Sequence, residues 1–187
     1  SGISWRIIFG GCAALALISP VIWMFVLQEY QKKRIVTLFD PESDALGAGW
    51  NIIQSKIAIG SGGLMGKGFT EGTQSHLGYL PEHHTDFIMS TLAEEFGFLG
   101  VMTLFVLFAA IIIRCLFISL NCFHNFGRLY VSATAMTFFF FVFLNSGMVS
   151  GILPVTGDPL PLMSYGGTAV IATLAGMGIV MSVHTHR

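Results

Sequence analysis

The chain has 187 residues, a formal net charge of -1, and 10% charged residues against 53% from the apolar set. Soluble domains carry roughly 25% charged residues, so this composition is typical of a membrane protein and excludes a disordered chain or a disulfide-rich secreted module. The near-zero charge provides no basic field, so no nucleic-acid partner is expected. The cysteines are odd in number and lack metal-ligand spacing, which predicts free thiols at Cys12, Cys115 and Cys122.

Four largely uncharged stretches are long enough, or nearly so, to cross a bilayer, which needs about 20 apolar residues. Their approximate ranges are 7–27, 86–113, 129–153 and 161–183. We therefore expect an all-α integral membrane protein in which residues 1–187 belong to one polytopic domain. A large polar loop, about 28–85, separates the first two spans.

The start of the second span has two readings. A helix from Asp86 to Arg114 would be roughly 42 Å long at 1.5 Å per residue, which matches a bilayer of about 40–45 Å with its head groups. Glu94 and Glu95 would then lie inside the membrane, where acids are paired or functional. Alternatively, the span begins at Phe96 and both acids are interfacial.

The polar loop contains one stretch of helical periodicity, WNIIQSKIAI at 50–59. Its apolar side chains Ile52, Ile53, Ile57 and Ala58 lie near one helix face. This pattern predicts a short amphipathic helix that lies at the membrane surface or dips into it.

Four spans place both termini on one side of the membrane. That side carries no acids and collects four arginines, Arg6, Arg114, Arg128 and Arg187. Basic residues close to span ends mark the cytoplasmic side, whereas long loops count for little. We therefore expect both termini of this chain in the cytoplasm and the large loop outside.

A glycine-rich stretch, GSGGLMGKG at 60–68, resembles a phosphate loop but fails the pattern. Ser61 and Gly68 stand where that pattern requires Gly and then Ser or Thr. The stretch is either a plain turn or a set of backbone amides that, with Lys56 and Lys67, faces a phosphorylated group.

The stretch LPEHHTDF at 80–87 carries two carboxylates, Glu82 and Asp86, four residues apart. On a helix they would share a face, and neighbouring carboxylates raise one pKa, which suits a general base or acid. The alternative is that Asp86 caps the second span. His83 and His84 would point about 100° apart on a helix, so a shared metal is not expected.

The segment between the last two spans, LPVTGDPLPLMSYGG at 153–167, holds three prolines and three glycines. These residues forbid a regular helix. We expect a shaped re-entrant or external turn that faces the large loop, since irregular backbone at membrane depth must be buried in protein or line a cavity.

Three strings in the chain resemble the SEDS family of bacterial cell-wall polymerases, and its elongation type more than its division type. They are GAGWNIIQSKIAIGSGGLMGKGF, QSHLGYLPEHHTDF and NSGMVSGILPVTGDPLPLMSYGG. Family members have about ten spans, of which this chain resembles only the last four. Gly78 stands where the division type usually has an acid, which favours the elongation type. The chain departs from the family at Ala45, where Pro is frequent, and at Asp158, where an apolar residue is usual.

The resemblance implies a peptidoglycan glycosyltransferase of the bacterial inner membrane that polymerises lipid II, with the polar loop in the periplasm. It implies Asp86 as the essential aspartate, acting as the base, and positive charge or a divalent cation for the leaving pyrophosphate. The residues expected to contact substrate are Lys56, Lys67, Glu82, His84, Ser164 and Tyr165.

The implied partners are a class B penicillin-binding protein, other membrane proteins of the elongation complex, and membrane lipids. Two alternatives to the enzyme stay open: a transporter of lipid-linked precursor, because Pro- and Gly-interrupted spans also mark transporters, and a scaffold for the penicillin-binding protein. We expect this 187-residue part to be inactive when isolated, since four helices offer little enclosed groove.

Overall fold

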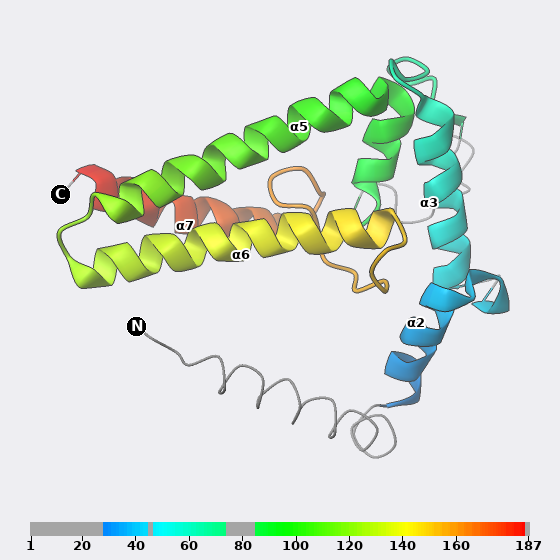
Figure 1. The fold of residues 1–187 in the computed structure, drawn as a ribbon, viewed down its shortest axis with the longest axis horizontal. Coiled ribbons are helices and arrows are strands. Elements are labelled where there is room, and N and C mark those ends of the chain that lie inside the picture. Colours follow the sequence, from blue (N-terminus) through cyan, green and yellow to red (C-terminus); the bar gives the residue numbers. More distant parts are fainter. Residues whose placement is uncertain (1–27, 45–46, 74–84, 186–187) are drawn as a thin grey trace, which may run out of the picture.

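The computed structural model describes residues 28–44, 47–73 and 85–185, and all its regular elements there are helical (Figure 1). In chain order they are α2 (Glu29–Phe39), the short 3-10 helix η2 (Pro41–Asp44), α3 (Ala48–Gly62), α5 (Ile88–Leu120), α6 (Asn125–Val149) and α7 (Gly167–Thr185). The span predicted at 7–27 lies outside the described residues.

Three of these helices, α5, α6 and α7, are long and apolar enough to cross a membrane. They lie along one another in Figure 1 and correspond to the last three predicted spans. The predicted start of the last span at Pro161 is wrong, because α7 begins only at Gly167. Pro159 and Pro161 hold the preceding segment out of helix, since proline lacks the N–H that a helix interior requires.

A helix running unbroken from Asp86 to Arg114 is also wrong. Gly97 has φ 64° and ψ -162°, a conformation that interrupts α5. The residues before it form a short segment, 88–96, which turns away and runs beside α3 (Figure 1). The long segment, 98–120, is roughly 34 Å by helical rise and suffices to cross the roughly 30 Å hydrocarbon core. The reading in which the span begins near Phe96 therefore agrees with the helix break.

Helix α3 confirms the helix predicted within the polar loop, but its buried face differs from the expected one. Ile52 and Ala58 are buried as expected, whereas Ile57 is exposed. Ser55 shares the buried face, and its hydroxyl donates to the Val149 carbonyl at 2.7 Å. The helix packs on the short segment of α5 and on the end of α6, so neighbouring protein defines its inner face.

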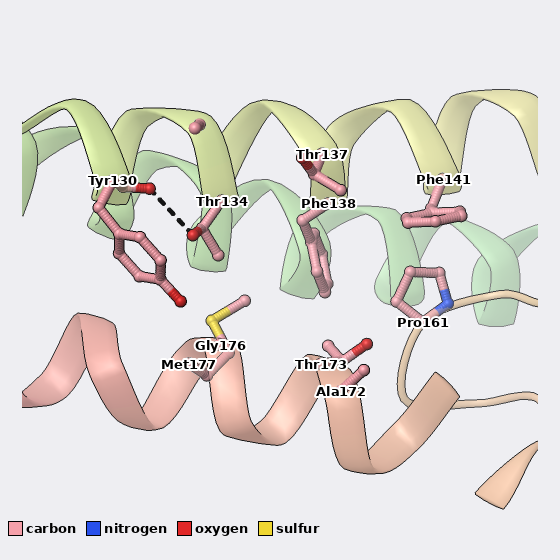
Figure 2. Close-up of a pocket in the computed structure, with 11 residues that line it drawn as sticks. Tyr130, Thr134, Thr137, Phe138, Phe141, Pro161, Ala172, Thr173, Gly176 and Met177 are labelled. Carbon is pink, nitrogen blue, oxygen red and sulfur yellow. Dashed lines mark hydrogen bonds between the residues drawn. The ribbon is translucent and has the colours of Figure 1, made fainter. Parts of the chain in front are cut away.

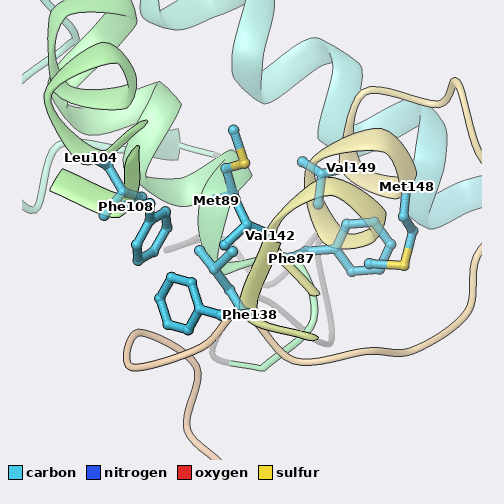
Figure 3. Close-up of a cluster of buried hydrophobic side chains, with 9 residues drawn as sticks. Phe87, Met89, Leu104, Phe108, Phe138, Val142, Met148 and Val149 are labelled. Atoms are coloured by element: carbon cyan, nitrogen blue, oxygen red, sulfur yellow. The ribbon is translucent and has the colours of Figure 1, made fainter. Parts of the chain in front are cut away.

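One apolar cluster joins both segments of α5 to α6 (Figure 3). At its centre Phe108 and Phe138 meet edge to face, with ring centroids 5.5 Å apart. Phe87, directly after Asp86, is fully buried in the same cluster. The core therefore fixes the backbone on which Asp86 stands. The buried members are Phe87, Met89, Leu104, Phe108, Phe138, Val142, Met148, Val149 and Leu160.

Candidate functional site

Asp86 lies in a turn immediately before α5, half-buried, where the chain passes from polar loop to span. Its carboxylate faces Gly157 of the proline-rich turn: a Cβ added at Gly157 would lie 3.4 Å from Oδ2. Gly157 has φ 80°, a conformation that side chains rarely adopt. Because residue 157 is glycine, no side chain of that residue packs against the carboxylate. The prediction that the turn 153–167 faces the large loop agrees with two hydrogen bonds, from Arg34 to the Thr156 carbonyl and from Ser164 to the Thr85 carbonyl.

Asn145 holds this junction together and was not singled out in the sequence analysis. Its fully buried amide nitrogen donates to the carbonyl oxygens of Asp86 and Asp158, both at 2.8 Å. One side chain of α6 thereby ties the start of α5 to the proline-rich turn. A polar amide that follows the apolar run FFFFVFL was the available signal, because buried amides need partners.

Ser164 forms a second tie at the same junction. Its buried hydroxyl donates to the Thr85 carbonyl at 2.6 Å and accepts from the Leu160 N–H at 2.7 Å. The structure therefore brings Ser164 to the Asp86 junction. Its hydroxyl proton is already donated to a backbone carbonyl, that of Thr85. Tyr165, by contrast, is largely exposed, and both residues line an open hollow beside Ile88. Glu82 and His84 lie outside the described residues.

Two cations reach the proline-rich turn and the glycine before it. Lys56 is exposed on α3, and its ammonium lies over Gly151, where a Cβ would come within 2.7 Å of Nζ. Arg34 of α2 donates from Nη1 to the Thr156 carbonyl at 3.2 Å, one residue before Gly157. Arg34 was missed as a candidate, although the run Lys32–Arg34 at the start of the loop offered a signal.

Lys67 lies at the other end of the short segment. Its ammonium pairs with the fully buried carboxylate of Glu94 at 2.7 Å and also donates to the Thr73 hydroxyl. Glu94 is about two helical turns from Asp86. The backbone amides of Lys67 and Gly68 donate to the carbonyls of Glu94 and Glu95 at 3.0 and 3.1 Å. This arrangement fits the plain-turn reading of the glycine-rich stretch better than a phosphate cradle.

The described residues bear on two further predictions, a bound divalent cation and free cysteine thiols. No group of three or more His, Cys, Asp or Glu side chains that could hold a metal occurs within residues 28–44, 47–73 and 85–185. Cys115 and Cys122 are free, as predicted, and Cys12 lies outside the described ranges.

A groove of about 280 Å³ runs between α6 and α7 and ends at Pro161 of the proline-rich turn (Figure 2). Two of its threonine hydroxyls are turned to their own helices: Thr134 donates to the Tyr130 carbonyl at 3.0 Å and Thr173 to the Ala169 carbonyl at 2.8 Å. The groove therefore presents a mainly apolar surface within the spans.

The fold and site define a multi-pass membrane protein with a carboxylate at the junction of a broken span and a glycine-containing turn. The family model described as "Cell cycle protein" (FtsW/RodA/SpoVE) matches residues 1–187, and the chain belongs to this family. The resemblance to SEDS proteins is confirmed. Membership and the three apolar helices make this a multi-pass inner-membrane protein.

The chain is similar to named relatives over its whole length but spans about half of theirs. It is 54% identical over 187 residues to "Peptidoglycan glycosyltransferase MrdB" of Escherichia coli (strain K12), covering 100% of this chain and 50% of the relative. It is 40% identical to "Peptidoglycan glycosyltransferase RodA" of Treponema pallidum, covering 95% of this chain and 41% of that protein.

Solved structures share the fold. One belongs to a study titled "Structural coordination of polymerization and crosslinking by a peptidoglycan synthase complex", with a TM-score of 0.77 and 38% identity over 98% of this chain and 50% of that chain. Another is the Rod shape determining protein RodA of Thermus thermophilus, with a TM-score of 0.53 and 46% identity over 56% of this chain and 34% of that one.

Proposed function

We propose that the full-length protein is a peptidoglycan glycosyltransferase that polymerises lipid II during cell elongation. The observation that carries the proposal is the Asp86 junction. A half-buried carboxylate faces Gly157, while its backbone is fixed by Asn145. A base must be held rigidly within reach of the proton that it removes. The names of the relatives support the same reaction.

In the proposed step, the 4-hydroxyl of the acceptor sugar attacks the anomeric carbon of the undecaprenyl-pyrophosphate-linked chain. Asp86 accepts the hydroxyl proton, a new glycosidic bond forms, and undecaprenyl pyrophosphate leaves with the electrons of the broken bond. Positive charge stabilises such a leaving group. Lys56 and Arg34 are cations at the proline-rich turn and can supply it. Lys67 stays a weaker candidate because Glu94 already neutralises it.

Contacts to substrate from Glu82, His84, Ser164 and Tyr165 stay predictions. Ser164 acts on the site in a different way from a direct contact, by holding the Thr85 carbonyl. The exposed ring of Tyr165 remains free to meet a sugar. In this proposal Ser164 holds the backbone next to Asp86 in place, and Tyr165 offers an exposed ring to the substrate.

The proposed partner is a class B penicillin-binding protein that crosslinks the new strands. The similar structure from a study of polymerisation and crosslinking in a synthase complex supports this choice. Elongation-complex membrane proteins and surrounding lipids complete the proposed setting.

A transporter of lipid-linked precursor is the second candidate, and the break of α5 at Gly97 favours it, because interrupted spans also occur in transporters. The deciding experiment supplies lipid II to purified full-length protein in detergent, where no membrane or gradient exists. Glycan strands are expected from the enzyme. If lipid II stays intact after incubation with the folded protein and its partner, the enzyme is excluded, and the transporter and the scaffold remain as candidate functions.

We also propose that the termini of this chain are cytoplasmic and residues 28–85 periplasmic. Cys122 lies between α5 and α6, on the side with Arg114 and Arg128. With Cys12 and Cys115 replaced by alanine, a membrane-impermeant thiol reagent should label Cys122 only after the cells are opened. Labelling in intact cells would reverse the topology.

A further inference from the structure

The glycine-rich loop, residues 63–69, carries an apolar tip that the proposed function does not use. Leu64, Met65 and Phe69 are 71%, 78% and 73% exposed. The tip lies against the break in α5, where the Phe69 ring is 6.0 Å from the ring of Phe96. Three large apolar side chains on one short loop are unusual for a surface in water and mark an interaction site.

The backbone of this loop is suited to a medium without water. The carbonyls of Gly63 and Leu64 accept from the amides of Phe98 and Leu99 at 2.9 and 3.2 Å. In the other direction, the amides of Lys67 and Gly68 donate to α5 carbonyls that the break at Gly97 releases. Non-helical backbone at membrane depth is tolerated only when its polar groups are satisfied in this way.

The charge of the loop is also suited to such a medium. Its one cation, Lys67, pairs with the fully buried Glu94 at 2.7 Å, and the Thr73 amide and hydroxyl also donate to that carboxylate, at 2.8 and 3.0 Å. A charge that is paired and hydrogen-bonded costs far less at low dielectric than a free one. The loop thus presents apolar side chains outward and keeps its charge inward.

The tip continues the exposed apolar surface of the long α5 segment. The amide of Leu99 in the first turn of the long α5 segment binds the loop, and that segment exposes Phe98, Leu99 and Met102 on a helix of span length. Because the long segment slightly exceeds the hydrocarbon core, its first turn lies near the boundary between head groups and acyl chains. The tip lies at the same level.

We propose that Leu64, Met65 and Phe69 form a wedge that inserts into the membrane leaflet next to the first turn of the long α5 segment. Lipid acyl chains are the occupant, in the manner of interfacial segments that bury apolar side chains about 5–10 Å deep. The wedge would fix the short segment of α5, with Asp86 at its other end, at the membrane surface. The proposal rests on the membrane location of the chain and is independent of its catalytic activity.

The test uses the full-length protein in lipid nanodiscs, with Cys12, Cys115 and Cys122 replaced by alanine. An environment-sensitive fluorophore is attached to Met65→Cys and, independently, to Phe69→Cys, so that failure of one variant to fold leaves the other. The matched control is Glu42→Cys, an exposed polar position in η2. Lipids with a nitroxide high on the acyl chain should quench most of the emission at both tip positions and little at the control.

Two results would overturn the proposal. Strong quenching of the tip by iodide in the buffer would place it in water. Shielding from both iodide and lipid nitroxides would show that protein covers it, either the partner or the part of the full-length protein that this chain lacks. Repeating the measurement without the partner identifies which protein is responsible.

Discussion

The two ends of the short α5 segment, 88–96, are held in different ways. At the Asp86 end, side chains from elsewhere grip the backbone: Asn145 binds the Asp86 carbonyl and Ser164 the Thr85 carbonyl. At the Gly97 end, backbone binds backbone and a buried ion pair closes the contact. The first arrangement leaves the Asp86 carboxylate half-exposed, and the second pairs the buried Glu94 carboxylate with Lys67.

This difference supports the proposal that the chemistry takes place at the Asp86 end. A reacting carboxylate must be accessible while its support is rigid, and Asp86 is half-buried on a backbone held by Asn145. The Glu94 carboxylate lies 2.7 Å from the Lys67 ammonium and has no exposed surface, so we assign Glu94 a structural role. Substitutions at the Gly97 end should therefore change stability first, and those at the Asp86 end activity first.

The largest expected effect is the loss of the helix break in Gly97→Ala. Gly97 has backbone angles essentially reserved for glycine, and a Cβ there would overlap the Gly66 amide nitrogen. Strain and overlap together should cost about 4 kcal/mol, measured as a lower thermal unfolding midpoint of the full-length protein in detergent. Gly60→Ala is the control: a Cβ at Gly60 meets nothing within 4 Å, so this variant should be at least as stable as the parent.

At the other end, Asp86→Asn should reduce polymerisation by a factor of about 10² or more, the scale of lost general-base catalysis. Thermal stability should stay near that of the parent, because Asn145 binds the Asp86 backbone, which the substitution leaves intact. Strand synthesis from lipid II by the purified full-length variant with its partner gives the measurement. Asp158→Asn, whose carbonyl shares the same amide, is the control and should stay active. Near-normal product from Asp86→Asn would leave Asp86 only a structural role.

The sequence analysis predicted the features that depend on residues close together in the chain. Three largely apolar stretches predicted α5, α6 and α7. Local pattern left Asp86 as either a base or a helix cap, and only the family resemblance favoured the base. It missed the features that depend on contacts between residues far apart in the chain. Gly97 in an apolar run reads as a tolerated helix residue, and only the approach of Gly66 explains its conformation. Likewise, Lys67 reads as a free cation until Glu94, 27 residues away, is brought beside it.

The ion pair should respond asymmetrically to loss of its two partners. Lys67→Met leaves a fully buried carboxylate without its ammonium partner, while Thr73 still donates to it, and should cost about 2 kcal/mol of unfolding free energy. Glu94→Gln leaves a lysine that can still reach water and should cost about 1 kcal/mol. The double variant should recover part of the Lys67→Met loss in thermal unfolding. Equal losses from both single substitutions would contradict this account of the buried charge.

The smallest expected effect comes from Arg34→Ala, which tests whether the cation at the proline-rich turn is structural or binds substrate. Arg34 is exposed, and its 3.2 Å bond goes to the carbonyl of Thr156, itself exposed. Water can replace that donor, so the unfolding free energy should fall by only about 0.5 kcal/mol. If Arg34 also stabilises the leaving pyrophosphate, polymerisation should fall about tenfold, the change that about 1.4 kcal/mol of lost transition-state stabilisation produces, while the protein stays folded. Arg34→Lys, which keeps the charge but loses the fork of donors, should then restore part of the rate. Equal, small losses of rate in both variants would confine Arg34 to holding α2 against the turn.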